Sequence, residues 1–246
     1  MSADSKLTRR SFVRLCASAV TLVSANPALL ARADTSYRRH QRVQLLNDRE
    51  RPLAVAQLKV GETYLFHYPY LATPCFLLDL GTPAARTWLT TEDGQRYLWD
   101  GGIGPQRSIV AFSAICAHKM THPAKQVSFI NYRHERVAFE NADKQVSERA
   151  QVIYCCSEKS VYDPVDGARV LGGPAKQPLA AIVLEQDAAG ALYAVGTTGG
   201  ALFERFFREF APRLELELRT ADVRKPVDKA TTVMRLADYC RNQVLC

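Results

Sequence analysis

The sequence predicts an all-β fold, either a two-sheet sandwich or a small barrel, on three observations. Short runs of β-branched and aromatic residues follow one another in the first half of the chain, glycines and prolines separate them, and one pair of runs brackets an Asp-Gly turn. Runs of this length and spacing are typical of antiparallel strands joined by tight turns. The chain has 246 residues, 47% of them hydrophobic, which is enough to build a core.

The expected strands can be placed along the chain by these signals. The Asp93-Gly94 pair favours a hairpin turn between its flanking strands, and residues 108–115 are nearly all apolar, which predicts a strand buried on both faces. The other expected strands are residues 53–58, 64–70, 75–80, 87–89, 96–99, 127–133, 136–140, 168–171, 180–185 and 192–195.

The C-terminal part of the sequence changes periodicity. Phenylalanines at 203, 206, 207 and 210 fall at i, i+3, i+4 and i+7 and predict one helix packed on the β-domain, with a membrane-surface helix as the alternative. Leucines at 214, 216 and 218 alternate with glutamates and predict a half-buried strand, and residues 231–244 are expected to form a last helix.

The N-terminus resembles an export signal of the twin-arginine type. Residues 8–13 read Thr-Arg-Arg-Ser-Phe-Val, a mild apolar run covers residues 15–31, and Ala31-Arg32-Ala33 is a small-residue cleavage pattern. Export to the periplasm with removal of residues 1–33 is therefore expected. Anchoring in the inner membrane through residues 12–31 is the alternative, disfavoured because an apolar run of about 17 residues falls short of the roughly 20 that span a bilayer.

The formal net charge of +7 does not indicate nucleic-acid binding. Residues 1–33 hold five basic residues and one acidic residue, a contribution of +4, so the remainder carries only +3. No compact basic patch interleaved with aromatic residues occurs in that remainder, and no nucleic-acid partner is expected.

Seven cysteines suggest more than one role. Cys16 would leave with the signal, and in an oxidising compartment the default for an even number is disulfides. Cys155 and Cys156 are adjacent, and Cys116 belongs to a Cys-x-His sequence, which suits a metal better. Cys75 is expected to be a small buried apolar residue, while Cys240 and Cys246 could pair with each other or with Cys75.

Two stretches together resemble the Rieske iron–sulfur proteins. In that family one loop supplies Cys-x-His, a second supplies Cys-x-x-His followed by Gly-Ser-x-Tyr/Phe-Asp, and a Gly-Pro-Ala loop covers the cluster. The first loop is matched by Cys116 and His118. The remaining matches are Cys155, Ser160, Tyr162, Asp163, Gly173, Pro174 and Ala175.

The resemblance implies a [2Fe-2S] cluster and a role for each matched residue. Cys116 and Cys155 would hold one iron and His118 the other. Ser160 would donate its hydroxyl to a bridging sulfide, and Tyr162 its phenol to a ligand sulfur. Gly173 and Pro174, with Ala175, would shield the cluster from water.

The fourth ligand departs from the family pattern. Glu158 stands where the second histidine belongs, so it could bind iron as a carboxylate, Cys156 could replace it, or His122 or His134 could approach from elsewhere. Binding by Glu158 or Cys156 would return negative charge to the site and lower its reduction potential. The cysteine pair that links the two loops in quinol-oxidising members is also absent, with Thr121 and Ser157 at those positions.

The resemblance implies a Rieske-like antiparallel β-sandwich with a small cluster-binding subdomain and C-terminal helices. The expected organisation is a signal at 1–33, a basic linker at 34–52, a Rieske-like domain at 53–200 and an extension at 201–246, with cluster loops at 116–122 and 155–175. The 36 residues between His118 and Cys155 are expected to include a surface hairpin where a partner docks.

The function that the resemblance implies is that of an exported protein, or a subunit of an oxidoreductase, that transfers single electrons. Its partners would be a quinol or an enzyme on one side, and a periplasmic acceptor such as a c-type cytochrome on the other. A cluster-free scaffold or accessory subunit of a periplasmic or membrane complex is the alternative. The sequence has no nucleophile elbow, phosphate loop or dinucleotide fingerprint, so no catalytic pocket of its own is expected.

Overall fold

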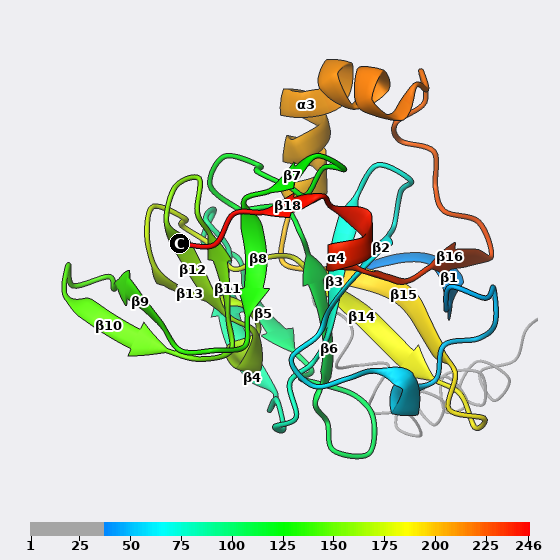
Figure 1. Cartoon of the computed structure of the whole chain (residues 1–246), viewed down its shortest axis with the longest axis horizontal. Coiled ribbons are helices and arrows are strands. Elements are labelled where there is room, and N and C mark those ends of the chain that lie inside the picture. Colours follow the sequence, from blue (N-terminus) through cyan, green and yellow to red (C-terminus); the bar gives the residue numbers. More distant parts are fainter. Residues whose placement is uncertain (1–36) are drawn as a thin grey trace, which may run out of the picture. The chain divides into compact units, whose positions relative to one another are not determined.

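The computed structural model describes residues 37–246, and the expected export signal and its cleavage site lie outside them. Within this range the chain is built mainly from antiparallel strands, as the sequence predicts, and forms one compact unit (Figure 1). No helix of the described part combines the length and the apolar character needed to cross a bilayer.

The largest sheet contains eight strands in the order β16-β1-β15-β14-β6-β3-β2-β17. Its centre is apolar on both faces: all five residues of β6 (Ile109–Ser113) and five of the six in β3 (Pro74–Asp79) are buried, as the continuous apolar run predicts. The other strands are β1 (Arg38–Leu46), β2 (Thr63–His67), β14 (Ala181–Gln186), β15 (Leu192–Thr198), β16 (Ala230–Thr232) and β17 (Met234–Arg235).

A second sheet of four strands, in the order β13-β12-β11-β8, carries the second loop of the Rieske resemblance. Its strands are β8 (Ile130–Arg133), β11 (Val152–Cys155), β12 (Ser160–Asp163) and β13 (Arg169–Gly172), with the short 3-10 helix η2 (Pro164–Asp166) after β12. Three further two-stranded pairs are β4 (Thr87–Thr90) with β5 (Arg96–Trp99), β9 (Val137–Glu140) with β10 (Val146–Arg149), and β7 (Val127–Ser128) with β18 (Asn242–Gln243).

Both hairpins anticipated from the sequence are present. Strands β4 and β5 flank the Asp93-Gly94 turn, where Gly94 has φ +83°. Strands β9 and β10 form the surface hairpin expected between the two loops, and it projects from the second sheet (Figure 1).

The helix predicted from the phenylalanine stripe is present as α3 (Leu202–Leu218), and it also includes the leucines that were expected to form a strand. Phe203, Phe206 and Phe207 are buried in the main core, so the helix packs on the β-domain. The strand expected from Leu214, Leu216 and Leu218 is wrong, because the helix continues through them. Leu214 is buried one turn beyond Phe210, whereas Leu216 is 81% exposed, so the leucines follow a helical period and not an alternating one.

Residues placed in the linker and in the C-terminal extension instead belong to the main sheet. Strand β1 pairs with β15 and β16, and Val43 and Leu45 are fully buried, so a linker over 38–46 is wrong. The expected helix at 231–244 is replaced by β16, β17, the four-residue helix α4 (Leu236–Tyr239) and β18, and the expected strand at 53–58 by the 3-10 helix η1 (Val55–Gln57). Tertiary pairing of short segments outweighs local pattern here.

Candidate metal centre

The two ligand loops meet, and one tyrosine joins them. The first loop follows β6 and is tight, because Cys116 N–H donates to Thr121 O (2.8 Å) and Met120 N–H to Cys116 O (3.0 Å). The second is the turn from Cys156 to Lys159 between β11 and β12, where Cys155 faces Ser160 in the ladder. The hydroxyl of Tyr162 lies 3.2 Å from Cys116 Sγ and accepts the Ala117 N–H at 3.1 Å.

Cys116 and Cys155 present two buried, unoxidised thiols to each other. Both are fully buried and neither forms a disulfide. A hydrogen bond from Cys155, aided by the Tyr162 hydroxyl and against the effect of burial, lowers the pKa of Cys116 to about 6. The same contact with Cys116, together with burial, raises the pKa of Cys155. The two thiols are therefore coupled, and Cys116 is the one that loses its proton first.

Each loop also contributes a buried polar atom without a partner. His118 Nδ1, from the first loop, and Ser160 Oγ, from the second, make no hydrogen bond within residues 37–246. Buried polar groups are nearly always hydrogen-bonded. These two atoms thus point to a group that the protein itself does not supply.

The two candidates for the fourth ligand are engaged elsewhere. The Glu158 carboxylate accepts from Lys119 Nζ at 2.9 Å, and this contact lowers its pKa. Cys156 forms a disulfide with Cys246, so Cys156 as a ligand is wrong. The expected pairing of Cys246 with Cys240 or Cys75 is wrong as well, and those two cysteines are free and buried.

The two candidate histidines, His122 and His134, contact other parts of the chain. His122 Nδ1 lies 3.0 Å from Met120 O, and its ring packs edge-on against Phe206 and Phe210 of α3. The His134 ring lies beside Tyr132 and Gly61. Among the described residues, no three His, Cys, Asp or Glu side chains are grouped to hold a single metal ion.

The Gly173-Pro174 loop packs directly on the second ligand loop. A Cβ at Gly173, where φ is +82°, would lie 2.2 Å from Lys159 O. Only glycine allows this approach of two backbones. The loop therefore lies beside Ser160.

Arg205 of α3 supports the first loop, and sequence reasoning missed it. Its guanidinium donates to Ala117 O (3.1 Å) and His118 O (2.6 Å), and it pairs with Glu209 at 2.8 Å and with Glu92 at 3.7 Å. In the sequence Arg205 is one charge among several on an amphipathic helix, so no local signal identifies it.

No protein-family model matches the chain. The solved structures that are similar to it include the soluble domain of the Rieske protein II (soxF) from Sulfolobus acidocaldarius, with 28% identity over 64% of this chain and 78% of that chain, and a TM-score of 0.44.

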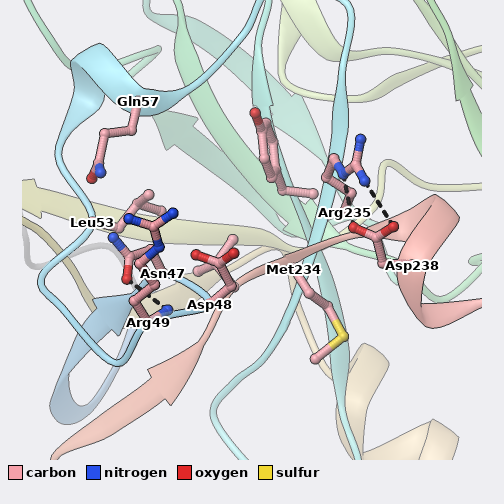
Figure 2. Close-up of a pocket in the computed structure, with 10 residues that line it drawn as sticks. Asn47, Asp48, Arg49, Leu53, Gln57, Met234, Arg235 and Asp238 are labelled. Atoms are coloured by element: carbon pink, nitrogen blue, oxygen red, sulfur yellow. Dashed lines mark hydrogen bonds and ion pairs between the residues drawn. The ribbon is translucent and has the colours of Figure 1, made fainter.

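A surface pocket of about 310 Å³ lies outside this site (Figure 2). The charges of two arginines and two aspartates in its lining cancel, and Arg235 forms an ion pair with Asp238 at 2.7 Å. None of the candidate ligands contributes to it. Its lining consists of Asn47, Asp48, Arg49, Leu53, Gln57, Tyr64, Val233, Met234, Arg235 and Asp238.

Proposed function

We propose that this chain is a Rieske-type [2Fe-2S] electron-transfer protein, or such a subunit of an oxidoreductase. It would pass single electrons between a quinol or enzyme partner and a periplasmic acceptor such as a c-type cytochrome. The observation that carries the proposal is the contact between the two loops, where the buried free thiols of Cys116 and Cys155 are hydrogen-bonded to each other. The same two loops carry two buried polar atoms without a protein partner, His118 Nδ1 and Ser160 Oγ.

The donors fit a binuclear cluster better than a single ion. Cys116 and Cys155 would hold one iron, and His118 Nδ1 the second, while Ser160 Oγ would donate to a sulfide. Each unpartnered buried polar atom costs about 1–3 kcal/mol, and binding would remove that penalty.

When bound, the cluster supplies a one-electron carrier, and the chain's own residues set its surroundings. The Tyr162 hydroxyl lies 3.2 Å from Cys116 Sγ, so it would donate to the sulfur of an ionised, iron-bound Cys116 and withdraw charge from it. Burial of both cysteines excludes water from the sulfur side. His118 is more exposed than either cysteine, which favours the side away from the two sulfurs for exchange with a partner.

For the fourth position we propose Glu158, released from its ion pair with Lys119. Glu158 belongs to the same turn as Cys155, and Lys119 to the same loop as His118, so the pair bridges the two loops. An anionic carboxylate in place of an imidazole predicts a reduction potential below the range of about −150 to +300 mV typical of two-histidine centres. Redox titration of the purified protein tests this, and a potential within that range would exclude Glu158.

Variants of this ion pair separate the two roles of Glu158. Glu158→Gln should lower iron content because the anionic ligand is lost. Lys119→Gln frees the carboxylate and should leave iron content equal or higher. Equal iron content in the wild type and in Glu158→Gln would show that the carboxylate is not a ligand.

Iron and acid-labile sulfide analysis of the full chain, purified anaerobically, tests the function itself. The expected result is a brown protein with about two irons and two sulfides per chain. Cys155→Ser should abolish both. Cys75→Ser, a matched change at another buried free cysteine whose Sγ donates to Tyr68 O, should preserve both.

A cluster-free scaffold or accessory subunit is the second candidate, favoured by the Glu158–Lys119 pair, which stabilises the turn without a metal. A colourless wild-type protein without iron or sulfide would select it.

We further propose export to the periplasm by the twin-arginine route, with anchoring through residues 12–31 as the alternative. The Cys156–Cys246 disulfide supports an oxidising compartment, because disulfides seldom persist in the cytosol. Cell fractionation of the wild type against Arg9→Lys with Arg10→Lys tests the route. Equal periplasmic yield would contradict it.

A further inference from the structure

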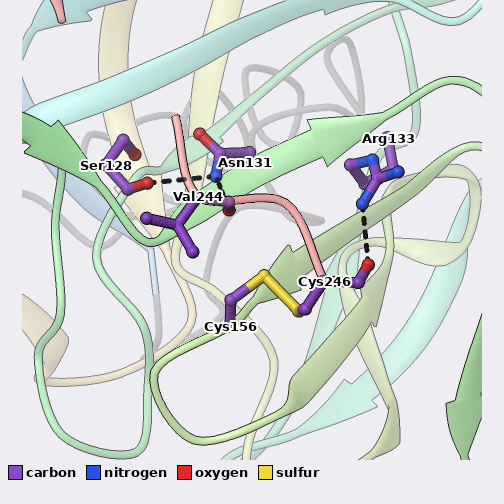
Figure 3. Close-up of a disulfide and its surroundings, with 6 residues drawn as sticks. All are labelled: Ser128, Asn131, Arg133, Cys156, Val244 and Cys246. Atoms are coloured by element: carbon purple, nitrogen blue, oxygen red, sulfur yellow. Dashed lines mark hydrogen bonds between the residues drawn. A yellow bond between two sulfur atoms is a disulfide. The ribbon is translucent and has the colours of Figure 1, made fainter. Parts of the chain in front are cut away.

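The last six residues, 241–246, form a C-terminal strap along the second sheet (Figure 3). Strand β18 runs parallel to β7. Arg241 N–H donates to Lys125 O (3.0 Å), and Val244 N–H donates to Ser128 O (2.8 Å). Chain ends usually fray unless they are tied down, and this one is tied along its length.

Two side chains of β8 bind the strap from the side. Asn131, 1% exposed, donates to Val244 O at 2.9 Å. Arg133 donates to Cys246 O at 2.8 Å. Side chains of β8, the strand that neighbours β11, therefore hold the strap in place.

The disulfide joins this strap to the second ligand loop. Cys246 bonds to Cys156, the residue after the candidate ligand Cys155, across a sequence separation of 90. The backbone of Cys156 also donates to Phe129 O at 2.7 Å. One covalent bond thus fixes the start of the turn that carries Glu158 and leads to Ser160.

With the strap bound, the site is closed. The thiols of Cys116 and Cys155 are fully buried, so a group that needs both sulfurs cannot reach them unless a neighbouring loop moves. The turn that follows Cys155 is held by a backbone hydrogen bond and an ion pair, and its covalent restraint is the disulfide next to Cys155.

We propose that the Cys156–Cys246 disulfide is a redox-controlled latch on the ligand loop. Formed, it holds the C-terminal strap and closes the site; reduced, it lets the turn open and exposes the two buried thiols. The latch orders two events, entry of an inorganic group under reducing conditions and locking under oxidising ones. The identity of that group rests on the proposed function, whereas the latch itself does not.

The chemistry of the latch is thiol–disulfide exchange. To open, a dithiol reductant supplies two electrons and two protons: the S–S bond breaks, Cys156 and Cys246 become thiols, and the reductant becomes a disulfide. To close, a protein disulfide accepts two electrons and two protons from the two thiols and becomes a dithiol.

Alkylation of the buried thiols measures opening directly. In the full chain stripped of iron by a chelator, iodoacetamide labelling of Cys116 and Cys155 is followed by mass spectrometry. Cys156→Ser with Cys246→Ser should label about tenfold faster than oxidised wild type, because opening no longer requires breaking a covalent bond. Cys240→Ser, a matched loss of a free cysteine from the same C-terminal region, should label at the wild-type rate.

A second measurement tests the latch in the wild type, so it remains valid even if the double variant folds poorly. Wild type treated with a dithiol should label fast and return to the slow rate on reoxidation, with matching changes in hydrogen exchange of residues 152–160. Unchanged labelling and exchange on reduction would overturn the latch, whether or not the protein binds iron. Faster labelling in a chain that never binds iron would sustain the latch and refute the proposed function.

Discussion

Replacing Tyr162 by Phe tests how the two ligand loops are joined. The hydroxyl is buried, accepts the Ala117 N–H at 3.1 Å and lies 3.2 Å from Cys116 Sγ. Because it accepts from the backbone, its own proton is available to the sulfur. The ring would still fill its place in Tyr162→Phe, so the change removes these two hydrogen bonds and little packing.

The loss of stability expected in Tyr162→Phe follows from the two hydrogen bonds that the hydroxyl makes. Leaving the buried Ala117 N–H unsatisfied costs about 1–3 kcal/mol, and the hydrogen bond between the hydroxyl and the sulfur contributes about 0.5–1.5 kcal/mol. The expected loss in unfolding free energy is therefore about 1.5–4.5 kcal/mol. The pKa of Cys116 should also rise, since the Tyr162 hydroxyl is one of the contacts that lower it.

Urea denaturation of the apoprotein gives the stability change, and the pH dependence of Cys116 alkylation gives the pKa. Tyr154→Phe in the adjacent strand β11 is the matched control, because its hydroxyl takes no part in these contacts, and a change within about 0.5 kcal/mol is expected. A loss below about 1 kcal/mol in Tyr162→Phe, with an unchanged alkylation profile, would refute the joining role.

Three further outcomes are expected. The disulfide closes a loop with a sequence separation of 90, so removing it with Cys156→Ser and Cys246→Ser should lower the unfolding free energy by about 4–5 kcal/mol. Calorimetry without reductant should show a drop of roughly 8–20 °C in Tm, and a drop under 3 °C would contradict this expectation. Phe206 is fully buried, so Phe206→Ala should lose about 3–5 kcal/mol in urea denaturation, and a loss below 1 kcal/mol would show that α3 is not part of the core. Burial lowers the pKa of His67 from 6.5 to about 4, so the unfolded chain binds more protons between these values, and stability present above pH 6.5 is lost as pH falls toward 4, by up to roughly 3 kcal/mol. Urea midpoints at pH 7 and pH 4.5 measure this, and a slope undiminished in His67→Gln would assign it to other groups.

The parts of the fold that the sequence predicts correctly are those with a dense local pattern. The Asp93-Gly94 turn, the fully buried β6 and the Phe206 face of α3 each depend on residues that are close together in the sequence. Periodicity and turn chemistry are therefore enough to predict them. Of the motif residues, Cys116 directly follows a strand that a local pattern predicts, whereas Cys155 and Tyr162 lie in β11 and β12, which were not predicted as strands and were found through the family motif.

What the sequence does not predict depends on distant partners. Strand β1 reads as a basic linker because its charged residues face solvent, and only Val43 and Leu45 reveal its buried side. The Cys156–Cys246 bond spans 90 residues, a pairing no spacing rule selects. Arg205 reaches the first ligand loop from a helix 87 and 88 positions away.

Electron–nuclear double resonance on the reduced, full-length protein with ¹⁵N-histidine tests the central claim most directly. The proposed site has a single imidazole ligand, His118, so we predict one strongly coupled histidine nitrogen, absent in His118→Gln. Two such nitrogens, or none in a protein that contains iron and sulfide, would contradict the ligand set.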